Sequence, residues 1–351
     1  MPDAAVAAVV VPDAAPAASV RAGCGSATLL VAPDDPAAPG PWPVGVRTLT
    51  LAGLKVEVWY PARPGARPAG ATPVAYDLAE ELPDAVAAKL RAAGKVLPAI
   101  PCACFRDLPL DDAHGPYPPV LYAHGLTLFR FASTTLTAHW ASRGFVVIAP
   151  DFPGAVLGDV LAHEPRPSND AVAADAARVL DAARTALFPG HLDWAHLGLT
   201  GHSLGGEVVS KLAATRGAVM VTMAERGVEP VPGRTFRTVV VGGTEDRVEP
   251  YAKQERGFAA SPEPKQLVPI EGGGHMSFTD VCEVAEDRGG LYAVAHAAGV
   301  PMDGFLAALA DRGCAQTKLS AAQAWPKILA ATTAALAPLQ CAPGPVAPST
   351  R

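Results

Sequence analysis

A serine at the centre of a glycine-flanked pentapeptide is the strongest chemical signal in the chain. The segment Gly201–Gly205 has the sequence Gly-His-Ser-Leu-Gly, which fits the pattern Gly-x-Ser-x-Gly. This spacing places Ser203 on a sharp turn between a strand and a helix, where the residues two before and two after crowd together and must lack side chains. The turn sets the hydroxyl at a helix N-terminus, where developing negative charge is stabilised. We therefore predict that Ser203 is a nucleophile.

A carboxylate follows the next apolar strands. After the β-rich run Thr238–Val241, the chain continues Gly-Gly-Thr-Glu-Asp, which places Glu245 and Asp246 in a loop just past a strand. A catalytic serine needs a base, and the base needs an acid that orients it. We favour Asp246 for this role because of its place in the Gly-Thr-x-Asp turn, and Glu245 is the alternative.

The base is expected on a glycine-rich turn. Gly272–Gly274 follow a predicted strand and lead to His275, so the order along the chain is serine, acid, histidine. The glycine turn gives the imidazole the freedom to reach both the hydroxyl and the carboxylate. His275 is predicted to take the proton of Ser203 and return it to the leaving alcohol, while Asp246 fixes the tautomer and stabilises the imidazolium.

Two backbone N–H groups are candidates for an oxyanion hole. The short strand Val120–Ala123 ends in His124-Gly125, and Leu126 follows. In this arrangement the loop after such a strand supplies one donor, and the residue after the serine supplies the other. The predicted donors are the N–H groups of Leu126 and Leu204, with His124 organising the loop.

The elements around these motifs alternate between strand and helix. Strands are expected at 46–51, 56–60, 120–123, 145–149, 197–200, 219–223, 238–241 and 266–270, and helices at 78–93, 136–142, 170–187, 204–215 and through most of 304–337. Such alternation predicts an α/β fold with a mostly parallel central sheet and helices on both faces. In such sheets the site lies beyond the carboxyl ends of the strands, where the three motifs fall.

The motifs and their order resemble the α/β-hydrolase superfamily, in particular the branch of predicted dienelactone hydrolases and platelet-activating-factor acetylhydrolase-like enzymes, whose relatives include chlorophyllases and polyester hydrolases. The resemblance runs through Pro41–Tyr60, Tyr117–Gly125 and Trp140–Gly154 to the three catalytic motifs. It implies a serine esterase, or lipase-like enzyme, that cleaves carboxylic esters or lactones through an acyl-enzyme and needs no cofactor. The short interval between Ser203 and Asp246 leaves little or no room for a cap domain and favours an open or loop-lined site.

Two other functions remain open at this point. The same triad serves an acyltransferase or thioesterase, and a non-catalytic binding protein can share the scaffold. Two possible metal sets, His191/Asp193/His196 and Cys102/Cys104, are incomplete, so no metal is expected.

Composition limits the partners. The chain has 351 residues, about half of them apolar and many of these alanine, with a formal net charge of −6. No run approaches the ~20 apolar residues of a membrane-spanning helix, and no basic run suits nucleic acid. The expected partner is a small-molecule or polymeric ester, and the sequence does not fix the oligomeric state. We expect a disordered Ala/Pro-rich segment at 1–40, one hydrolase domain at 41–342 and a flexible tail at 343–351.

Six cysteines bear on the compartment. Four lie in loops or the C-terminal part, which favours disulfides and an exported protein, whereas free thiols in a cytoplasmic enzyme are the alternative. Cys102 and Cys104 lie too close along the chain to be expected to pair with each other, and Cys282 is expected to pair with Cys314 or Cys341. Met1–Ser19 lacks the basic start and apolar centre of a secretory signal, so a signal is expected upstream.

Overall fold

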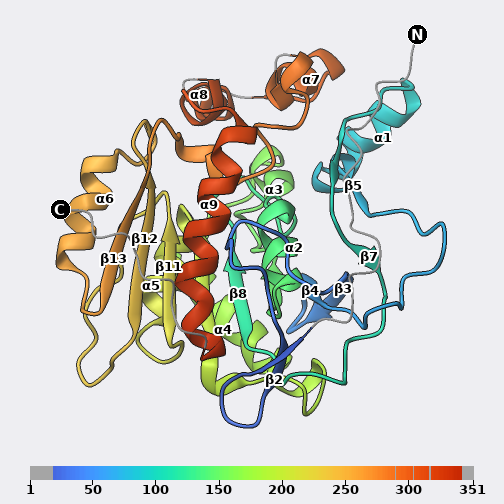
Figure 1. The fold of residues 1–351 in the computed structure, drawn as a ribbon. Helices are drawn as coiled ribbons and strands as arrows, with labels where there is room; N and C mark the ends of the chain where they lie inside the picture. Colours follow the sequence, from blue (N-terminus) through green and yellow to red (C-terminus); the bar gives the residue numbers. More distant parts are fainter. Residues whose placement is uncertain (1–18, 289, 303, 316–317, 342–351) are drawn as a thin grey trace.

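A large sheet forms the centre of the molecule in the computed structural model, which describes residues 19–288, 290–302, 304–315 and 318–341 (Figure 1). Within the described residues the strands of this sheet are β3 (Val44–Leu51), β4 (Leu54–Pro61), β7 (Phe105–Arg106), β8 (Pro119–Ala123), β9 (Val146–Pro150), β10 (Gly198–His202), β11 (Val219–Met223), β12 (Arg237–Gly243) and β13 (Lys265–Ile270). Their order across the sheet is β13-β12-β11-β10-β8-β9-β4-β3-β7.

Six neighbouring strands, from β13 to β9, pair in parallel. The antiparallel hairpin of β3 and β4 extends the sheet, with β4 pairing antiparallel to β9. Chain order reverses beside β8, because β9 lies on one side of β8 and β10 on the other. The mostly parallel sheet predicted from the sequence is confirmed, and a reversal of this type opens a crevice at the carboxyl ends of the strands.

Helices cover both faces of this sheet (Figure 1). Their bounds are α1 (Asp84–Ala92), α2 (Thr134–Ser142), α3 (Leu157–Leu161), α4 (Asn169–Ala186), α5 (Leu204–Leu212), α6 (Tyr251–Ala260), α7 (Gly290–Ala298), α8 (Gly304–Ala310) and α9 (Ala321–Leu336). Val120 and Tyr122 of β8 point into the core beneath α2 and α9, whereas Leu121 and Ala123 point into the core beneath α4 and α5. Each face of the strand is therefore apolar, as a sheet buried on both sides requires.

Shorter elements connect these layers. A small hairpin pairs β1 (Val20–Ala22) with β2 (Thr28–Leu30), and a second antiparallel pair joins β5 (Ala75–Asp77) to β6 (Ala99–Pro101) on either side of α1 in the chain. Short 3₁₀ helices span Leu78–Glu81, Trp194–His196, His275–Phe278, Glu286–Arg288 and Ala337–Gln340, and a π-helical turn spans Asp311–Ala315.

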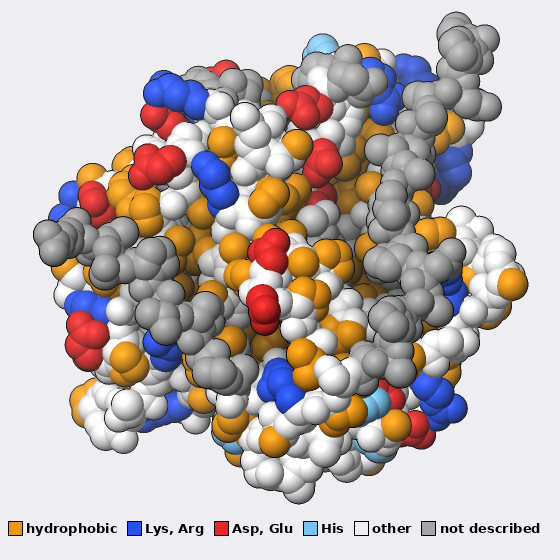
Figure 2. All heavy atoms as spheres, in the orientation of Figure 1, with side chains coloured by type: hydrophobic (Ala, Val, Ile, Leu, Met, Phe, Trp, Pro, Cys, Tyr) orange, Lys and Arg blue, Asp and Glu red, His pale blue; other side chains and the backbone are white. Residues whose placement is uncertain are grey.

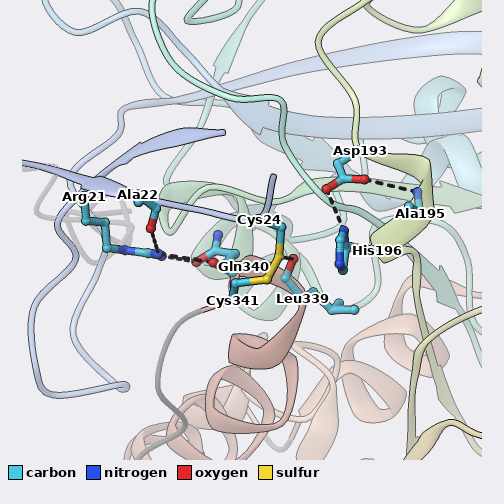
Figure 3. The surroundings of a disulfide bond; sticks show 9 residues. All are labelled: Arg21, Ala22, Cys24, Asp193, Ala195, His196, Leu339, Gln340 and Cys341. Carbon is cyan, nitrogen blue, oxygen red and sulfur yellow. Dashed lines mark hydrogen bonds and ion pairs between the residues drawn. A yellow bond between two sulfur atoms is a disulfide. The ribbon is translucent and has the colours of Figure 1, made fainter. Parts of the chain in front are cut away.

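The first part of the described chain differs from the disorder that we expected through residue 40. The β1–β2 hairpin is tied to the other end of the chain by a disulfide between Cys24 and Cys341, and Arg21 donates a hydrogen bond to the side chain of Gln340 at 2.6 Å (Figure 3). The guanidinium of Arg143 further binds the carbonyls of Pro33 and Ala38. Covalent and polar anchors thus order this segment. Residues 1–18 and 342–351 lie outside the described residues. The expected disorder of residues 1–18 and the expected flexible tail at 343–351 therefore fall outside the described part of the chain.

All six cysteines are paired, and one pair corrects the sequence analysis. Cys282 pairs with Cys314, one of its two expected partners, but Cys102 pairs with Cys104, which we did not expect. The reason lies in the backbone: Cys102 N–H and Cys104 C=O both bond to Val74, so the chain bulges between them. The bulge brings the two Cα atoms to 5.1 Å, within the usual range for a disulfide.

Charged and apolar side chains are interspersed over the face of the molecule seen in Figure 2. None of the described helices has both the length and the apolar character that crossing a bilayer requires.

Candidate active site

Ser203 occupies a backbone conformation that few side chains adopt. It lies between β10 and α5 with φ 52° and ψ −119°, and its N–H donates to the carbonyl of Met223 at 2.9 Å. A Cβ added to Gly201 would lie 2.1 Å from the carbonyl oxygen of Gly205, and one added to Gly205 would lie 1.9 Å from the carbonyl oxygen of Ala123. Both glycines are therefore sterically required, which is the reason given by the sequence analysis for this spacing.

The loops after β12 and β13 bring Asp246 and His275 together. The Nδ1 atom of His275 lies 2.9 Å from Oδ2 of Asp246, and both side chains are buried. Oδ1 of Asp246 accepts hydrogen bonds from the backbone N–H groups of Val248 and Glu249, at 2.9 and 2.8 Å. A proton on Nδ1 is favoured by this carboxylate, so Nε2 is left as the basic nitrogen of His275.

Gln254 is a contributor that sequence reasoning missed. It lies on α6, is fully buried, and its Nε2 donates to Oδ2 of Asp246 at 3.1 Å. The rival carboxylate, Glu245, instead pairs with Lys318 at 2.6 Å. The structure thus brings Asp246, and not Glu245, to His275.

His202 supports the loop that carries His275. Its Nε2 lies 2.8 Å from the carbonyl oxygen of His275, and burial lowers the pKa of His202 to about 3, with the neighbouring His275 as a further cause. His202 is therefore neutral and donates from Nε2. Its ring also lies close to Gly125, where a Cβ would come within 2.9 Å of Nδ1.

The loop after β8 is held just before Leu126 by hydrogen bonds of His124. His124 bonds to the carbonyl of Gly125 through Nδ1 at 2.8 Å and accepts from the N–H of Phe152 through Nε2 at 3.2 Å. Leu126 lines the same cavity as Ser203, and within the described part of the chain its N–H donates no hydrogen bond. Leu204, at the first position of α5, also lines this cavity, and the first N–H groups of a helix have no intrahelical partner.

Arg130 anchors the far end of this loop, which the sequence analysis did not foresee. Its N–H and guanidinium bind the two carboxylate oxygens of Asp151, at 2.7 and 2.8 Å, and the guanidinium also contacts Glu81 at 2.5 Å. Burial lowers the pKa of Arg130, but the surrounding carboxylates outweigh that effect and raise it above its ordinary value. The loop is thus fixed by a buried charged cluster.

A cavity of about 740 Å³ joins the predicted site residues. Ser203, His275, Leu126 and Leu204 line it, together with charged side chains that the sequence analysis did not assign: Arg166, Glu207, Glu225, Arg226, Glu249, Lys253 and Arg256. Burial raises the pKa of Glu225 to about 7, and Glu207 pairs with Arg226. We call this hollow the polar cavity.

A second cavity, of about 690 Å³, adjoins the first and is mostly apolar. We call it the apolar cavity. Its cover is α7, α8 and the Cys282–Cys314 disulfide, which together we call the roof. Helices α7 and α8 lie beyond one end of the sheet (Figure 1). No cap is inserted between Ser203 and Asp246 within the described chain, as expected. However, the helices of the roof follow His275, and α8 contributes Phe305 and Leu309 to the polar cavity, so a helix as well as loops lines the site.

The two metal sets considered from the sequence have other partners. The sulfurs of Cys102 and Cys104 are bonded to each other, and His196 lies 2.6 Å from Asp193, which also caps the 3₁₀ helix Trp194–His196 (Figure 3). Cys24, Cys341 and His196 lie near one another, but the two sulfurs form a disulfide and are not thiolate ligands.

Comparison with known proteins finds one matching family model and similar solved structures. Residues 100–241 match the family model for chlorophyllase, and no curated protein matches the chain. The solved ferulic acid esterase from Streptomyces cinnamoneus is similar over 90% of this chain and 95% of its own, with a TM-score of 0.63 and 24% identity. TT1662 from Thermus thermophilus matches 74% of this chain and 99% of its own at 20% identity and a TM-score of 0.40.

The fold is thus found again in an esterase of nearly the same length, and the family match spans β8 to β12, which includes the elbow. The chain has the α/β-hydrolase fold.

Proposed function

We propose that this protein is a serine hydrolase that cleaves carboxylic esters or lactones through an acyl-enzyme on Ser203. The observation that carries the proposal is the convergence of Ser203, on its strained turn, with the bonded pair of His275 and Asp246 at one cavity. The match to chlorophyllase and the likeness to a ferulic acid esterase support ester hydrolysis as the reaction class.

In the proposed mechanism Oγ of Ser203 attacks the ester carbonyl carbon while Nε2 of His275 removes the hydroxyl proton. The carbonyl π electrons move to oxygen, and the resulting oxyanion accepts hydrogen bonds from Leu126 N–H and Leu204 N–H, each worth about 3 kcal/mol. The tetrahedral intermediate collapses, the C–O bond to the alcohol breaks, and His275 gives its proton to the leaving oxygen. A water then repeats the sequence on the acyl-enzyme and releases the acid and free Ser203.

In this scheme the acid is held in place before substrate arrives. Asp246 is held by four hydrogen-bond contacts, from Val248, Glu249, Gln254 and His275, so it is ready to stabilise the imidazolium that forms during attack. Pre-organised dipoles of this kind need no rearrangement during the reaction, which is the main source of their catalytic effect.

The test pairs a fluorophosphonate label with turnover of p-nitrophenyl acetate, butyrate and octanoate. Wild type is expected to be labelled once and to hydrolyse the esters, and Ser203→Ala is expected to lose both properties. Ser210→Ala, on the same helix but outside the polar cavity, is the matched control and is expected to behave as wild type. Labelling of the Ser203→Ala variant, or an unlabelled and inactive wild type with a native melting curve, would overturn the proposal. Faster acyl transfer to an added alcohol than to water would indicate an acyltransferase instead.

We also propose that the protein is exported to an oxidising compartment. The support is that Cys24, Cys102, Cys104, Cys282, Cys314 and Cys341 are all paired, since reducing compartments keep such thiols free. Thiol titration of the denatured protein from its native host is expected to find no free thiol, and titration of every cysteine would contradict the proposal.

A further inference from the structure

Two cavities of different character meet beside the candidate nucleophile. The polar cavity contains Ser203 and His275, and the apolar cavity lies under the roof. Met276 and Leu309 line both cavities. Because Met276 directly follows His275, the boundary between the cavities lies one residue from the proposed base.

The wall of the apolar cavity comes from segments far apart in the sequence. Its apolar side chains include Leu78, Leu82, Phe129, Leu291, Val300 and Leu306. Glu286, Asp311 and Lys318 also line it, but all three are exposed residues. The inner wall is therefore mostly apolar, with the hydroxyl residues Thr127, Ser277 and Thr279 among its lining and the charged residues on the solvent side.

The size of this hollow separates it from a packing defect. Protein interiors contain few voids larger than a water molecule, because side chains that face empty space lose dispersion contacts. A hollow of about 690 Å³ instead falls within the range of small-molecule sites. It is also fixed in place, since both sulfurs of the Cys282–Cys314 disulfide belong to residues that line it.

We propose that the apolar cavity binds a large apolar group of the ester substrate, and that Met276 and Leu309 form the threshold this group crosses. The inference rests on the proposed function, because it assigns the substrate class of the same site: esters with a long or bulky apolar arm beside the scissile bond. Methionine suits the threshold since its unbranched, flexible side chain adapts to different chain shapes.

Selectivity is the expected consequence. Each methylene transferred from water into an apolar site strengthens binding by about fourfold, so wild type is expected to prefer octanoate to acetate esters in kcat/KM. The acyl or the alcohol side of the ester can carry the apolar arm. Isomeric pairs separate the two, because methyl octanoate carries the chain on the acid and octyl acetate carries it on the alcohol.

A matched pair of substitutions on α8 tests the inference. Ala307 lines the apolar cavity, whereas its neighbour Ala308 does not. Ala307→Trp is expected to lower kcat/KM for methyl octanoate or octyl acetate by about tenfold or more relative to kcat/KM for p-nitrophenyl acetate, since it fills the space that the methylenes would occupy. Ala308→Trp is expected to leave both unchanged. Leu291→Trp, on α7, repeats the test from another helix if Ala307→Trp does not fold.

The outcomes separate this inference from the proposed function. Turnover of acetate with no preference for methyl octanoate or octyl acetate would overturn the inference and leave the ester hydrolase intact. The same holds if Ala307→Trp and Leu291→Trp keep the wild-type preference. A wild type that hydrolyses no ester would overturn the proposed function. In that case decanoate displacement of 1-anilinonaphthalene-8-sulfonate, followed by fluorescence, still tests the cavity. Displacement in wild type but not in Ala307→Trp supports it, and equal displacement in both contradicts it.

Discussion

The floor of the site and its roof are held in place by different means. The floor consists of the loops after β10, β12 and β13, which carry Ser203, Asp246 and His275 at the carboxyl ends of paired parallel strands. Close backbone approaches and a dense set of hydrogen bonds fix it. The roof contains no strand of the central sheet, and the disulfide between Cys282 and Cys314 closes it.

This difference indicates that the floor and the roof have different roles, catalysis for the floor and selection of the apolar group for the roof. A reaction that depends on hydrogen-bond geometry needs groups held to a fraction of an ångström, which the strand ends and the tight elbow provide. A wall that only selects for apolar bulk tolerates looser packing. We therefore expect substitutions in the floor to act on all esters alike, and substitutions in the roof to act on long esters more than on short ones.

Among substitutions in the floor, Gly205→Ala is expected to cause the largest loss of activity. A Cβ there would lie 1.9 Å from the carbonyl oxygen of Ala123, so the elbow cannot keep its shape. Gly205→Ala is expected to abolish turnover of every ester and to lower the melting temperature. Gly304→Ala, in the roof, meets no atom within 4 Å and is expected to keep full activity. Esterase assays and circular dichroism melts check both, and an active Gly205→Ala would show that the elbow is not required.

Asp246→Asn alters the floor without adding bulk. The amide oxygen still accepts from Val248 and Glu249, but the amide group no longer holds the required tautomer of His275 or stabilises its cation. By analogy with other triads, kcat is expected to fall by about 10⁴ for acetate and octanoate esters alike. Glu245→Gln removes the rival carboxylate, which pairs with Lys318, and is expected to keep kcat within about twofold because an exposed ion pair contributes little. A larger loss of kcat in Glu245→Gln than in Asp246→Asn would assign the role of the acid to Glu245.

Removal of the roof disulfide tests whether the roof acts on long esters more than on short ones. The Cys282→Ser, Cys314→Ser double variant opens a covalent loop with a sequence separation of 32, a constraint worth about 3–4 kcal/mol in the chain-entropy view. A looser roof holds an apolar arm less well, so octanoate turnover is expected to fall by about tenfold and acetate turnover by less than about threefold. The Cys24→Ser, Cys341→Ser variant is the control, because that disulfide lies outside both cavities. Equal losses in the two double variants would indicate a general stability effect.

The floor could be predicted from the sequence because each of its motifs depends on residues that lie close together in the chain. The Gly-x-Ser-x-Gly turn, the carboxylate after a strand and the histidine on a glycine turn each depend on residues a few positions apart. Buried parallel strands also give apolar runs, so the core strands were expected close to where they lie. The same local view left Asp246 and Glu245 as alternatives, which only the fold separates by placing Lys318 beside Glu245.

The roof and the supporting contacts could not be predicted because they join distant segments. Gln254 reaches Asp246 from α6, a helix that the sequence analysis did not assign, and Leu78 meets Leu309 across the apolar cavity only in the folded chain. The Cys102–Cys104 disulfide depends on a bulge opposite Val74, which sequence separation alone does not reveal.

The smallest expected effect concerns Asp280, in the segment that joins the floor to the roof and that we call the seam. It is an effect on stability and on the pH dependence of stability. Asp280 follows the His275 loop in the chain and precedes Cys282; it is buried, and its Oδ2 accepts from the N–H of Thr135 at 3.0 Å. Burial raises the pKa of Asp280 to about 7, and Glu283 raises it further, whereas the bonds from Thr135 act in the opposite direction. The folded state thus binds this proton more tightly than the unfolded chain, whose aspartate pKa is about 4.

It follows that the contribution of Asp280 to stability is complete below about pH 4 and declines as the pH rises from about 4 to about 7. Asp280→Asn keeps an acceptor for Thr135 but cannot ionise, so it is expected to melt a few degrees above wild type at pH 8 and close to it at pH 4. Melting curves of both proteins across pH 4–8 measure this difference. Parallel curves across that range would mean that Asp280 is ionised in the folded protein, and the seam would then carry a buried charge that the surrounding groups stabilise.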